Sequence, residues 1–270
     1  MLRDRLGLSE RRACRYVDQH RSTQRRPATV AADDQALRAE LRQIAGAYPR
    51  WGYRRVHHEL CGQGWEINRK RVQRVWREEG LRVPPRARKR RRAADQPDRG
   101  ALRATRPDEV WAIDFQRDMT ADGRALRLVN VIDEYTRQAL TMRVERSISA
   151  DETVTELEAL VARRGRAPRF LRCDNGPELT SHALRDWCRF NAAETAFIEP
   201  GAPWQNPFVE SFHARVRDEL LNVEQFACLA EARVGIADWR EGYNTRRPHS
   251  ALGMRTPAAF AADCTHATAG

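Results

Sequence analysis

Apolar residues recur at helical spacing between residues 31 and 83. One apolar stripe begins after Asp33 and is ended by Pro49, and a second runs out at Gly62. Residues three and four apart lie on one face of a helix, so both stretches are predicted to be helices with one buried face. A third helix follows, and together they predict a compact helical unit.

The third helix of this unit has the clearest boundaries. Asn68 suits its N-cap and Gly80 suits its C-terminal stop. Opposite its apolar face lies a polar stripe at i, i+3, i+4, i+7 spacing, formed by Lys70, Gln73, Arg74 and Arg77. An ordinary solvated face is one interpretation. Three cationic residues on the last helix of a compact trio favour a recognition helix for a DNA groove or its phosphates.

From residue 109 the pattern changes to short apolar runs typical of strands. The predicted order along the chain is three strands, a helix, a strand, a helix, a strand and a final helix. Ser149 and Glu152 form a capping box for the first of these helices, and Gly165 ends it. This order indicates a mixed α/β sheet in which helical crossovers connect parallel neighbours.

Charge divides the chain in the same way. Residues 1–100 hold 26 Lys and Arg against 12 Asp and Glu, a net +14, whereas residues 101–270 hold 22 against 25, a net −3. A basic part joined to a nearly neutral part indicates a region that binds a polyanion, nucleic acid above all.

The segment that joins the two parts is itself basic. Residues 84–101 contain three prolines and no apolar periodicity, which predicts a flexible linker. Arg88, Lys89 and Arg90 are expected to lie along a phosphate backbone. A merely solvated linker is the alternative, and the two interpretations are compatible.

Composition excludes two classes of protein. No stretch approaches the roughly 18 apolar residues of a membrane span, and the start of the chain lacks the apolar core of a signal peptide. The six cysteines show no paired spacing, which favours free thiols in a reducing cytoplasm. A cytoplasmic protein without a membrane partner is therefore expected.

Three carboxylates stand out by their position. Asp114 lies inside the first predicted strand between apolar neighbours, where an unpaired charge is costly. Asp174 stands at the tip of the fourth strand, just before an Asn-Gly turn. Glu210 falls in the opening turns of a helix that Asn206 would cap and Pro207 would begin.

Strand order would bring these carboxylates together. If the first and fourth strands are parallel neighbours, Asp114 and Asp174 meet at one end of the sheet and Glu210 closes the cluster. Their mutual repulsion then calls for a cation, and hard oxygen ligands suit Mg²⁺ or Mn²⁺. Two such ions can clamp the attacking and leaving oxygens of a phosphodiester. A turn residue, an ion pair and a surface charge would explain the three residues singly, but their joint placement favours a metal site.

Five separated motifs resemble one family, the OrfB-type transposases of bacterial insertion sequences, relatives of retroviral integrase. "WAIDF", "CDNGPE" and "PWQNPFVESF" resemble its three catalytic motifs, with 35 residues between Asp174 and Glu210 (175–209) as is typical of the group. "YPRWGYRRVHHEL" and "INRKRVQRVWREEGL" resemble its helix-turn-helix segment. "YNTRRPHSALGMRTPAAF" (243–260) resembles its closing motif.

The resemblance implies a ribonuclease-H-like mixed five-stranded sheet flanked by helices and preceded by a small all-α helix-turn-helix domain. The expected parts are a basic arm (1–30), the helix-turn-helix-like domain (31–83), the basic linker (84–104), the catalytic core (105–225) and a C-terminal helical extension (226–270).

The resemblance also implies metal-dependent DNA cleavage and strand transfer. Asp114, Asp174 and Glu210 would be the catalytic and metal-binding residues, with two Mg²⁺ or Mn²⁺ ions. The expected partners are the element's terminal repeats, target DNA, further copies of the chain on DNA, and an upstream helix-turn-helix and coiled-coil protein to which the chain can be fused. A DNA-binding regulator, an incomplete half of a frameshift-fused transposase, and a structure-selective nuclease remain open alternatives.

Some residues near the motifs have less certain roles. Pro207 stands where relatives carry a small residue, although proline is tolerated at this helical position. Glu178 completes the second motif, with Asn175 and Gly176, but has no assigned catalytic duty. Trp204, Arg215 and Arg217 could contact DNA, or could serve as core packing and a solvated helix face.

Overall fold

The computed structural model describes residues 7–25, 32–82, 102–176, 178–199 and 205–267. Arg88, Lys89, Arg90, Trp204 and most of the predicted linker lie outside the described residues. The basic arm contains two short helices, α2 (Glu10–Tyr16) and α3 (Arg21–Arg25).

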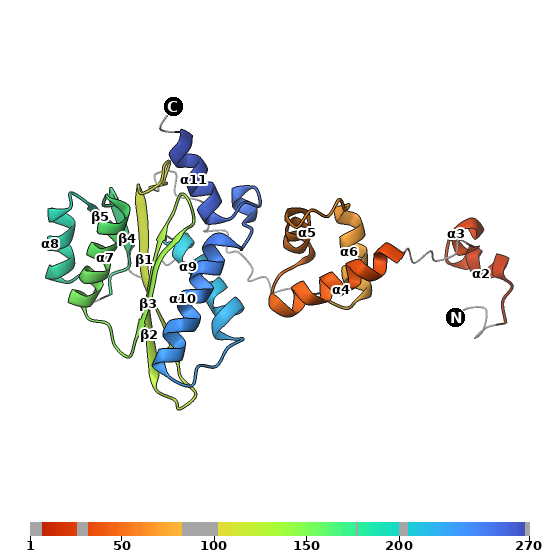
Figure 1. Cartoon of the computed structure of the whole chain (residues 1–270), viewed down its shortest axis with the longest axis horizontal. Coiled ribbons are helices and arrows are strands. Elements are labelled where there is room, and N and C mark those ends of the chain that lie inside the picture. Colours follow the sequence, from red (N-terminus) through yellow and green to blue (C-terminus); the bar gives the residue numbers. More distant parts are fainter. Residues whose placement is uncertain (1–6, 26–31, 83–101, 177, 200–204, 268–270) are drawn as a thin grey trace.

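A three-helix N-terminal module follows, built from α4 (Ala32–Ala47), α5 (Tyr53–Gly62) and α6 (Arg69–Glu78) (Figure 1). Asn68 caps α6 as predicted, because its side chain accepts a hydrogen bond from the Lys70 backbone N–H at 2.8 Å. Gly80 follows the helix with φ +71°. The stripes of the three helices meet in one apolar core formed by Leu37, Leu41, Ile44, Trp51, Val56, Leu60, Val72, Val75 and Trp76.

The second part of the chain is built on a five-stranded sheet in the order β3-β2-β1-β4-β5. Its strands are β1 (Val110–Met119), β2 (Ala125–Asp133), β3 (Ala139–Glu145), β4 (Phe170–Cys173) and β5 (Glu194–Phe197). The first three strands are antiparallel, whereas β4 pairs in parallel with both β1 and β5. The predicted mixed sheet, with the first and fourth strands as parallel neighbours, is confirmed.

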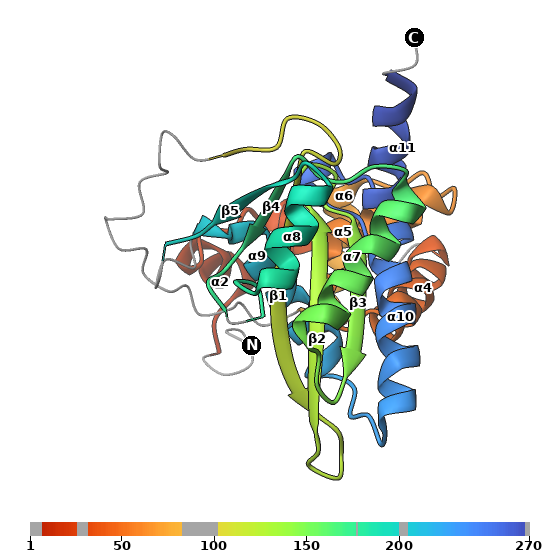
Figure 2. The same cartoon turned by 90° about the vertical axis from the view of Figure 1, so that its left-hand side faces the viewer.

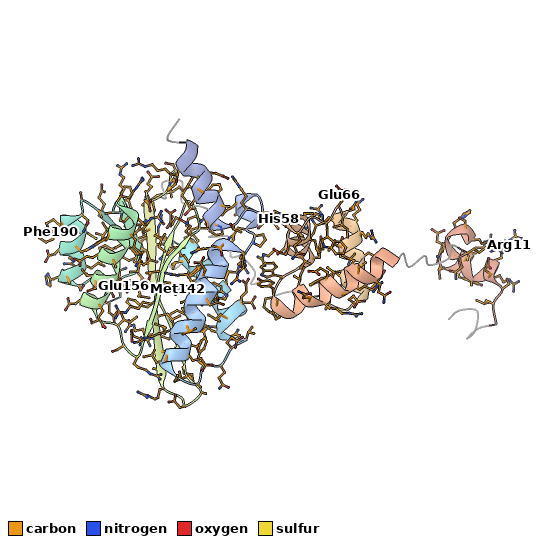
Figure 3. The ribbon with its side chains drawn as sticks, in the orientation of Figure 1. Arg11, His58, Glu66, Met142, Glu156 and Phe190 are labelled. Atoms are coloured by element: carbon orange, nitrogen blue, oxygen red, sulfur yellow. The ribbon has the colours of Figure 1, made fainter. Side chains whose placement is uncertain are left out.

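Helices cover both faces of the sheet (Figure 1). One face packs against α7 (Ala150–Arg164) and α8 (His182–Phe190), and the other packs against α9 (Pro207–Val216) and α10 (Leu229–Thr245). Side chains that alternate along each strand feed the two cores. The turned view in Figure 2 shows α7 and α8 lying over the sheet, and Figure 3 shows Met142 of β3 and Glu156 of α7.

Local sequence signals set the ends of the core helices. The capping box of α7 forms as predicted, with Ser149 and Glu152 bonding each other's backbone N–H, and Gly165 ends the helix at φ +69°. A π-helical turn, Arg217–Leu221, continues α9 directly. These signals fix where each helix starts, but the partner of each helix is set by long-range packing.

The C-terminal segment is part of the same globule as the sheet. Ala232, Ile236 and Tyr243 of α10 share one apolar core with β2 and β3. A short 3-10 turn, Ser250–Leu252, and helix α11 (Pro257–Ala267) complete the chain. Among the helices that the structure describes, none is long and apolar enough to cross a bilayer.

Candidate active site

β1 carries Asp114 on the sheet face that α9 covers. One carboxylate oxygen accepts a hydrogen bond from the Phe115 backbone N–H at 2.7 Å, and the other lies 3.6 Å from Nδ1 of His213. Burial raises the pKa of Asp114 to about 6, against the lowering effect of the Phe115 N–H, and the charges of Asp174 and Glu210 raise it further. Asp114 is therefore within electrostatic range of the other two predicted carboxylates.

The strand register brings Asp174 to the level of Asp114. Val110 pairs with Phe170 and Ala112 with Arg172, an offset of 60 residues (170 − 110). The pairing ends there, and the same offset, continued for two residues, would set position 174, just past the end of β4, level with position 114.

The residues after Asp174 hold its carboxylate in place. Its Oδ1 accepts a hydrogen bond from the Gly176 backbone N–H at 2.9 Å. A Cβ atom at residue 176 would stand only 3.0 Å from that oxygen, so glycine permits the close approach. The side-chain amide of Asn175 donates to the carbonyl of Ile198, beyond the end of β5, at 2.6 Å. The Asn-Gly pair thus positions the carboxylate and ties the turn to the neighbouring strand.

Glu178, to which the sequence analysis assigned no catalytic role, forms an ion pair with Arg127 of β2 at 2.8 Å. The Arg127 guanidinium also lies over the Phe115 ring, 4.3 Å from its centroid. Phe115 directly follows Asp114 on β1. The pair therefore links the turn after Asp174 to the strand that carries Asp114.

Glu210 lies in the first turn of α9, as predicted, and is exposed. Pro207 occupies the first turn without breaking the helix. Asn206 stands at the N-cap position, but its side chain makes no capping hydrogen bond, contrary to the prediction. Its backbone has φ −116° and ψ 53°, outside the extended conformation usual for a capping residue.

His213 was missed by sequence reasoning and lies one turn beyond Glu210. Its Nε2 is 2.9 Å from the side-chain amide nitrogen of Asn130, the register partner of Asp114 on β2. With that amide donating to Nε2, the ring proton sits on Nδ1, the nitrogen that faces Asp114. Burial and then the charge of Arg217 lower the pKa of His213 to about 4. The neutral ring thus presents a donor toward Asp114.

Arg172 of β4 is a second residue that the sequence analysis missed. Its Nη1 donates to the Gln205 carbonyl at 2.6 Å, just before α9 begins. Its Nη2 donates to the carbonyl of Leu102, and its Nε lies 2.8 Å from Oε1 of Glu134. One buried side chain of β4, the strand that precedes Asp174, thus holds the segment that leads into α9, the helix of Glu210.

The donor set fits a divalent cation by its chemistry. Carboxylate oxygens are the ligands that Mg²⁺ and Mn²⁺ prefer. The pKa of Asp114 is raised by burial first and then by the charges of Asp174 and Glu210, and a bound cation would offset those charges. Asp114 and Asp174 each have one oxygen engaged by a backbone N–H, and the second oxygen of Asp114 faces His213 at 3.6 Å. Over the described residues, no three His, Cys, Asp or Glu side chains stand in a ready-made arrangement around a cation.

The predicted DNA-contacting stripe lies on the N-terminal module, apart from the carboxylates. Lys70, Arg74 and Arg77 are exposed on α6, and Gln73 is half-buried. Arg74 forms ion pairs with Asp34 at 3.0 Å and with Glu78 at 2.9 Å. Part of the charge of this stripe is therefore offset within the module.

Three family models match the chain. An "HTH-like domain" model covers residues 32–90, and two "Integrase core domain" models cover residues 104–203 and 191–257. Together they span the N-terminal module, the sheet and helix α10.

Individual relatives extend over nearly the full chain. The insertion element IS407 uncharacterized 31.7 kDa protein of Burkholderia multivorans is 40% identical over 261 residues, covering 97% of this chain and 93% of that protein. Transposase InsD for insertion element IS2 of Escherichia coli is 27% identical over 244 residues, covering 84% and 79%.

Among solved structures, a chain of a simian T-cell lymphotropic virus intasome superposes with a TM-score of 0.53 at 14% identity, covering 73% of this chain and 67% of that chain. This similarity bears on the fold alone. The matched domains and the relative at 40% identity show that the chain belongs to the OrfB-type family of insertion-sequence transposases.

Proposed function

We propose that this transposase cuts DNA at the ends of its insertion sequence and joins them to target DNA, with Asp114, Asp174 and Glu210 as its catalytic carboxylates. The observation that supports the proposal is the parallel pairing of β1 with β4, which ends at Ala112 and Arg172, two residues before Asp114 and Asp174. Glu210 contributes to the same electrostatic cluster from α9.

The three carboxylates would hold divalent cations, two by analogy with other phosphodiester-cleaving sites. Mg²⁺ or Mn²⁺, when bound, supplies Lewis-acid stabilisation to the attacking and leaving oxygens of a phosphodiester. The chain's own residues position the carboxylates, with Gly176 and Phe115 donating backbone hydrogen bonds to them. Arg172 holds the segment before α9 in place.

The bond changes balance without an energy cofactor. In the first step a water oxygen attacks phosphorus, the bond to the 3′ oxygen breaks, and that oxygen leaves as a 3′-OH. In the second step this 3′ oxygen attacks a target phosphorus, and the target's own 3′ oxygen leaves. Strand transfer therefore exchanges one phosphodiester for another.

The proposed partners follow from this chemistry. The chain would act on terminal repeats and target DNA in the bacterial nucleoid. Two element ends require two active sites, so further copies of the chain would assemble on DNA, with the upstream helix-turn-helix and coiled-coil protein fused or alongside.

The test is a joining assay with a labelled duplex that carries the terminal repeat and a supercoiled target. The expected products with Mg²⁺ are a nicked end and a labelled strand joined to the target. Nicks without joined product would indicate a structure-selective nuclease instead. Binding without chemistry would indicate a regulator or an incomplete half, and fusing the upstream reading frame would distinguish those two.

The Arg127–Glu178 pair is predicted to support catalysis by positioning. Glu178→Gln is expected to slow cleavage about tenfold, since small misplacements of reacting groups are costly, while a partly exposed pair changes stability by only about 0.5 kcal/mol. Arg127→Met should have a similar effect, and the double variant should be no slower than either single one. Cleavage rates and urea unfolding measure both quantities, and additive rate losses would show that the two residues act separately.

The exposed face of α6 is predicted to contact DNA phosphates. The plot of log binding constant against log salt concentration has a negative slope, to which each phosphate contact contributes roughly 0.9. The double variant Lys70→Ala/Arg77→Ala should make this slope shallower by about two. Arg42→Ala on α4 is the control, because it removes an exposed positive charge from the same module. Arg74→Ala is a poorer probe, since it also removes one of the two arginines paired with Asp34, which is only 3% exposed. An unchanged slope in the double variant would sink the recognition-helix assignment.

A further inference from the structure

A pocket of about 340 Å³ opens beside α9, where the closing motif packs against the core. The closing motif lines it with Tyr243, Arg247, His249, Ser250 and Ala251, and α9 lines it with Ser211 and Arg215. The turn after β2 adds Arg137, and α5 of the N-terminal module adds Arg55. The resemblance identified the closing motif by its residues, but the proposed chemistry gives it no role.

Positive charge dominates this pocket, which we call the basic pocket. Arg55, Arg137, Arg215 and Arg247 line it, and none of the described residues that line it is acidic. Arg247 is paired with Glu219 behind the wall, through hydrogen bonds of 2.6 and 2.7 Å. Glu219, and for Arg137 also Glu134 and Asp133, offset part of this charge from outside the lining. The described residues that line the pocket carry positive charge alone, so the pocket has a positive field.

Arg137 adds a donor without an internal partner. Its guanidinium lies 3.8 Å from the centroid of the Phe208 ring, and its Nη1 is buried with no hydrogen-bond partner within the described part of the chain. A buried cationic donor that lacks an acceptor is costly. An anion bound nearby would supply the missing acceptor.

The ionisation of neighbouring groups reflects the same field. Burial, and then repulsion from Arg247, lowers the pKa of Arg55 to about 10. Burial first, and then the surrounding arginines, lowers the pKa of His249 to about 3. His249 is therefore neutral, and its Nε2 can accept from Arg247, 3.3 Å away.

Helix geometry places the basic pocket next to the catalytic carboxylates. Ser211 and Arg215 are four residues apart and lie on one stripe of α9. Glu210 directly precedes Ser211, so its side chain projects about 100° around the same helix. One helix therefore presents a carboxylate to the reaction and a basic stripe to the adjoining surface.

We propose that the basic pocket binds a backbone phosphate of the bound DNA, other than the phosphate that is cleaved. This inference rests on the proposed function, and it deepens it by giving the closing motif a ligand. Arginine is suited to phosphate because its planar guanidinium donates two hydrogen bonds in parallel. Serine hydroxyls at positions 211 and 250 supply further donors.

The contribution of Arg55 links the two parts of the chain. Its Nε donates to the Pro248 carbonyl of the closing motif at 3.3 Å, and its Nη1 lies 3.9 Å from Glu219. A phosphate in the basic pocket would therefore contact the N-terminal module and the catalytic core together. DNA held by the module would be fixed relative to the carboxylates.

The test compares three variants that each change the net charge by −1. Arg215→Ala removes a pocket arginine, and Ser250→Glu places a carboxylate in the pocket from an exposed position. Arg246→Ala is the matched control, because Arg246 belongs to the same motif but lines a different cavity and pairs with Asp238. Binding of the full chain to a labelled terminal-repeat duplex is measured in EDTA across a range of salt concentrations.

Arg215→Ala and Ser250→Glu are each expected to make the slope of log binding constant against log salt concentration shallower by about one, as the loss of one phosphate contact predicts. Each should also weaken DNA binding about fivefold at 0.15 M salt. Arg246→Ala should leave the slope unchanged. Equal effects in all three variants would overturn the proposal, since they would report only the general field. If Arg215→Ala proves unstable in a melting experiment, Ser250→Glu decides, because it deletes no existing contact.

The binding test of the basic pocket can fail or succeed independently of the cleavage test of the proposed function, because EDTA prevents metal-dependent chemistry. A slope difference in a chain that never cleaves with Mg²⁺ would support the basic pocket and refute the proposed reaction. Cleavage and joining by the wild type, with three variants that bind alike, would support the reaction and refute the pocket.

Discussion

Asp174→Asn is expected to abolish DNA cleavage and joining while DNA binding survives. The substitution keeps the size of the side chain but removes the charge that would hold a divalent cation. Metal-assisted stabilisation contributes several kcal/mol to phosphodiester chemistry, so the rate should fall at least about 1,000-fold. The hydrogen bond from Gly176 can still form with the amide oxygen, so the turn should keep its conformation.

Glu210→Gln and Asp114→Asn should cause losses of the same order, because the three carboxylates form one electrostatic cluster. Rates would be measured on a terminal-repeat duplex with Mg²⁺, with Mn²⁺ and with EDTA, and EDTA should stop the wild type. Glu194→Gln serves as the control, since Glu194 is an exposed carboxylate on β5 of the same sheet. If Asp174→Asn cleaves DNA at the wild-type rate, the assignment of the three catalytic carboxylates is refuted.

The sequence predicted the parts of the site that depend on local pattern. Asp174 could be found because a strand, an Asn-Gly turn and a helix follow one another along the chain. Glu210 could be found because a proline marks the start of its helix. The predicted approach of Asp174 to Asp114 depended on one topological assumption, the parallel pairing of β1 with β4, which the structure confirms. The predicted approach of Glu210 depended on its helix packing against the sheet.

The residues that support the carboxylates were missed because their partners are distant in sequence. His213 and Asn130 are 83 residues apart, and Gln116 and the carbonyl of His213 are 97 apart. No periodicity in the chain indicates such contacts. They arise because α9 returns to cover the face of β1 and β2, and only the order of strands and layers decides that.

Arg172 illustrates the same limit from inside a strand. A charged residue between Leu171 and Cys173 in a short buried strand could be noticed from the sequence as unusual. Alternation places it on the opposite face from those neighbours. Its acceptors, however, come from Leu102, Glu134 and Gln205, three segments that only the folded sheet brings together.

Arg172→Met is expected to destabilise the catalytic core by about 3–5 kcal/mol, because it leaves a buried carboxylate without its partner. Glu134 is 1% exposed, and Arg172 itself is 7% exposed. Urea unfolding measures the loss. Arg169→Met is the control, since Arg169 is an exposed arginine three residues earlier in the chain. Glu134→Gln in the Arg172→Met background should recover part of the stability, because the unpaired charge is then absent.

The pH dependence provides an independent check on the same pair. Burial raises the pKa of Glu134 from 4.5 to about 7, against the lowering effects of Arg172 and Arg137. The native state therefore holds a proton that the unfolded state releases, and this contribution to stability is present below pH 4.5 and lost as the pH rises through 7. Glu134→Gln should remove this decline between pH 4.5 and 7, whereas Arg172→Met should extend it to higher pH. A decline that persists unchanged in Glu134→Gln would show that another group titrates there.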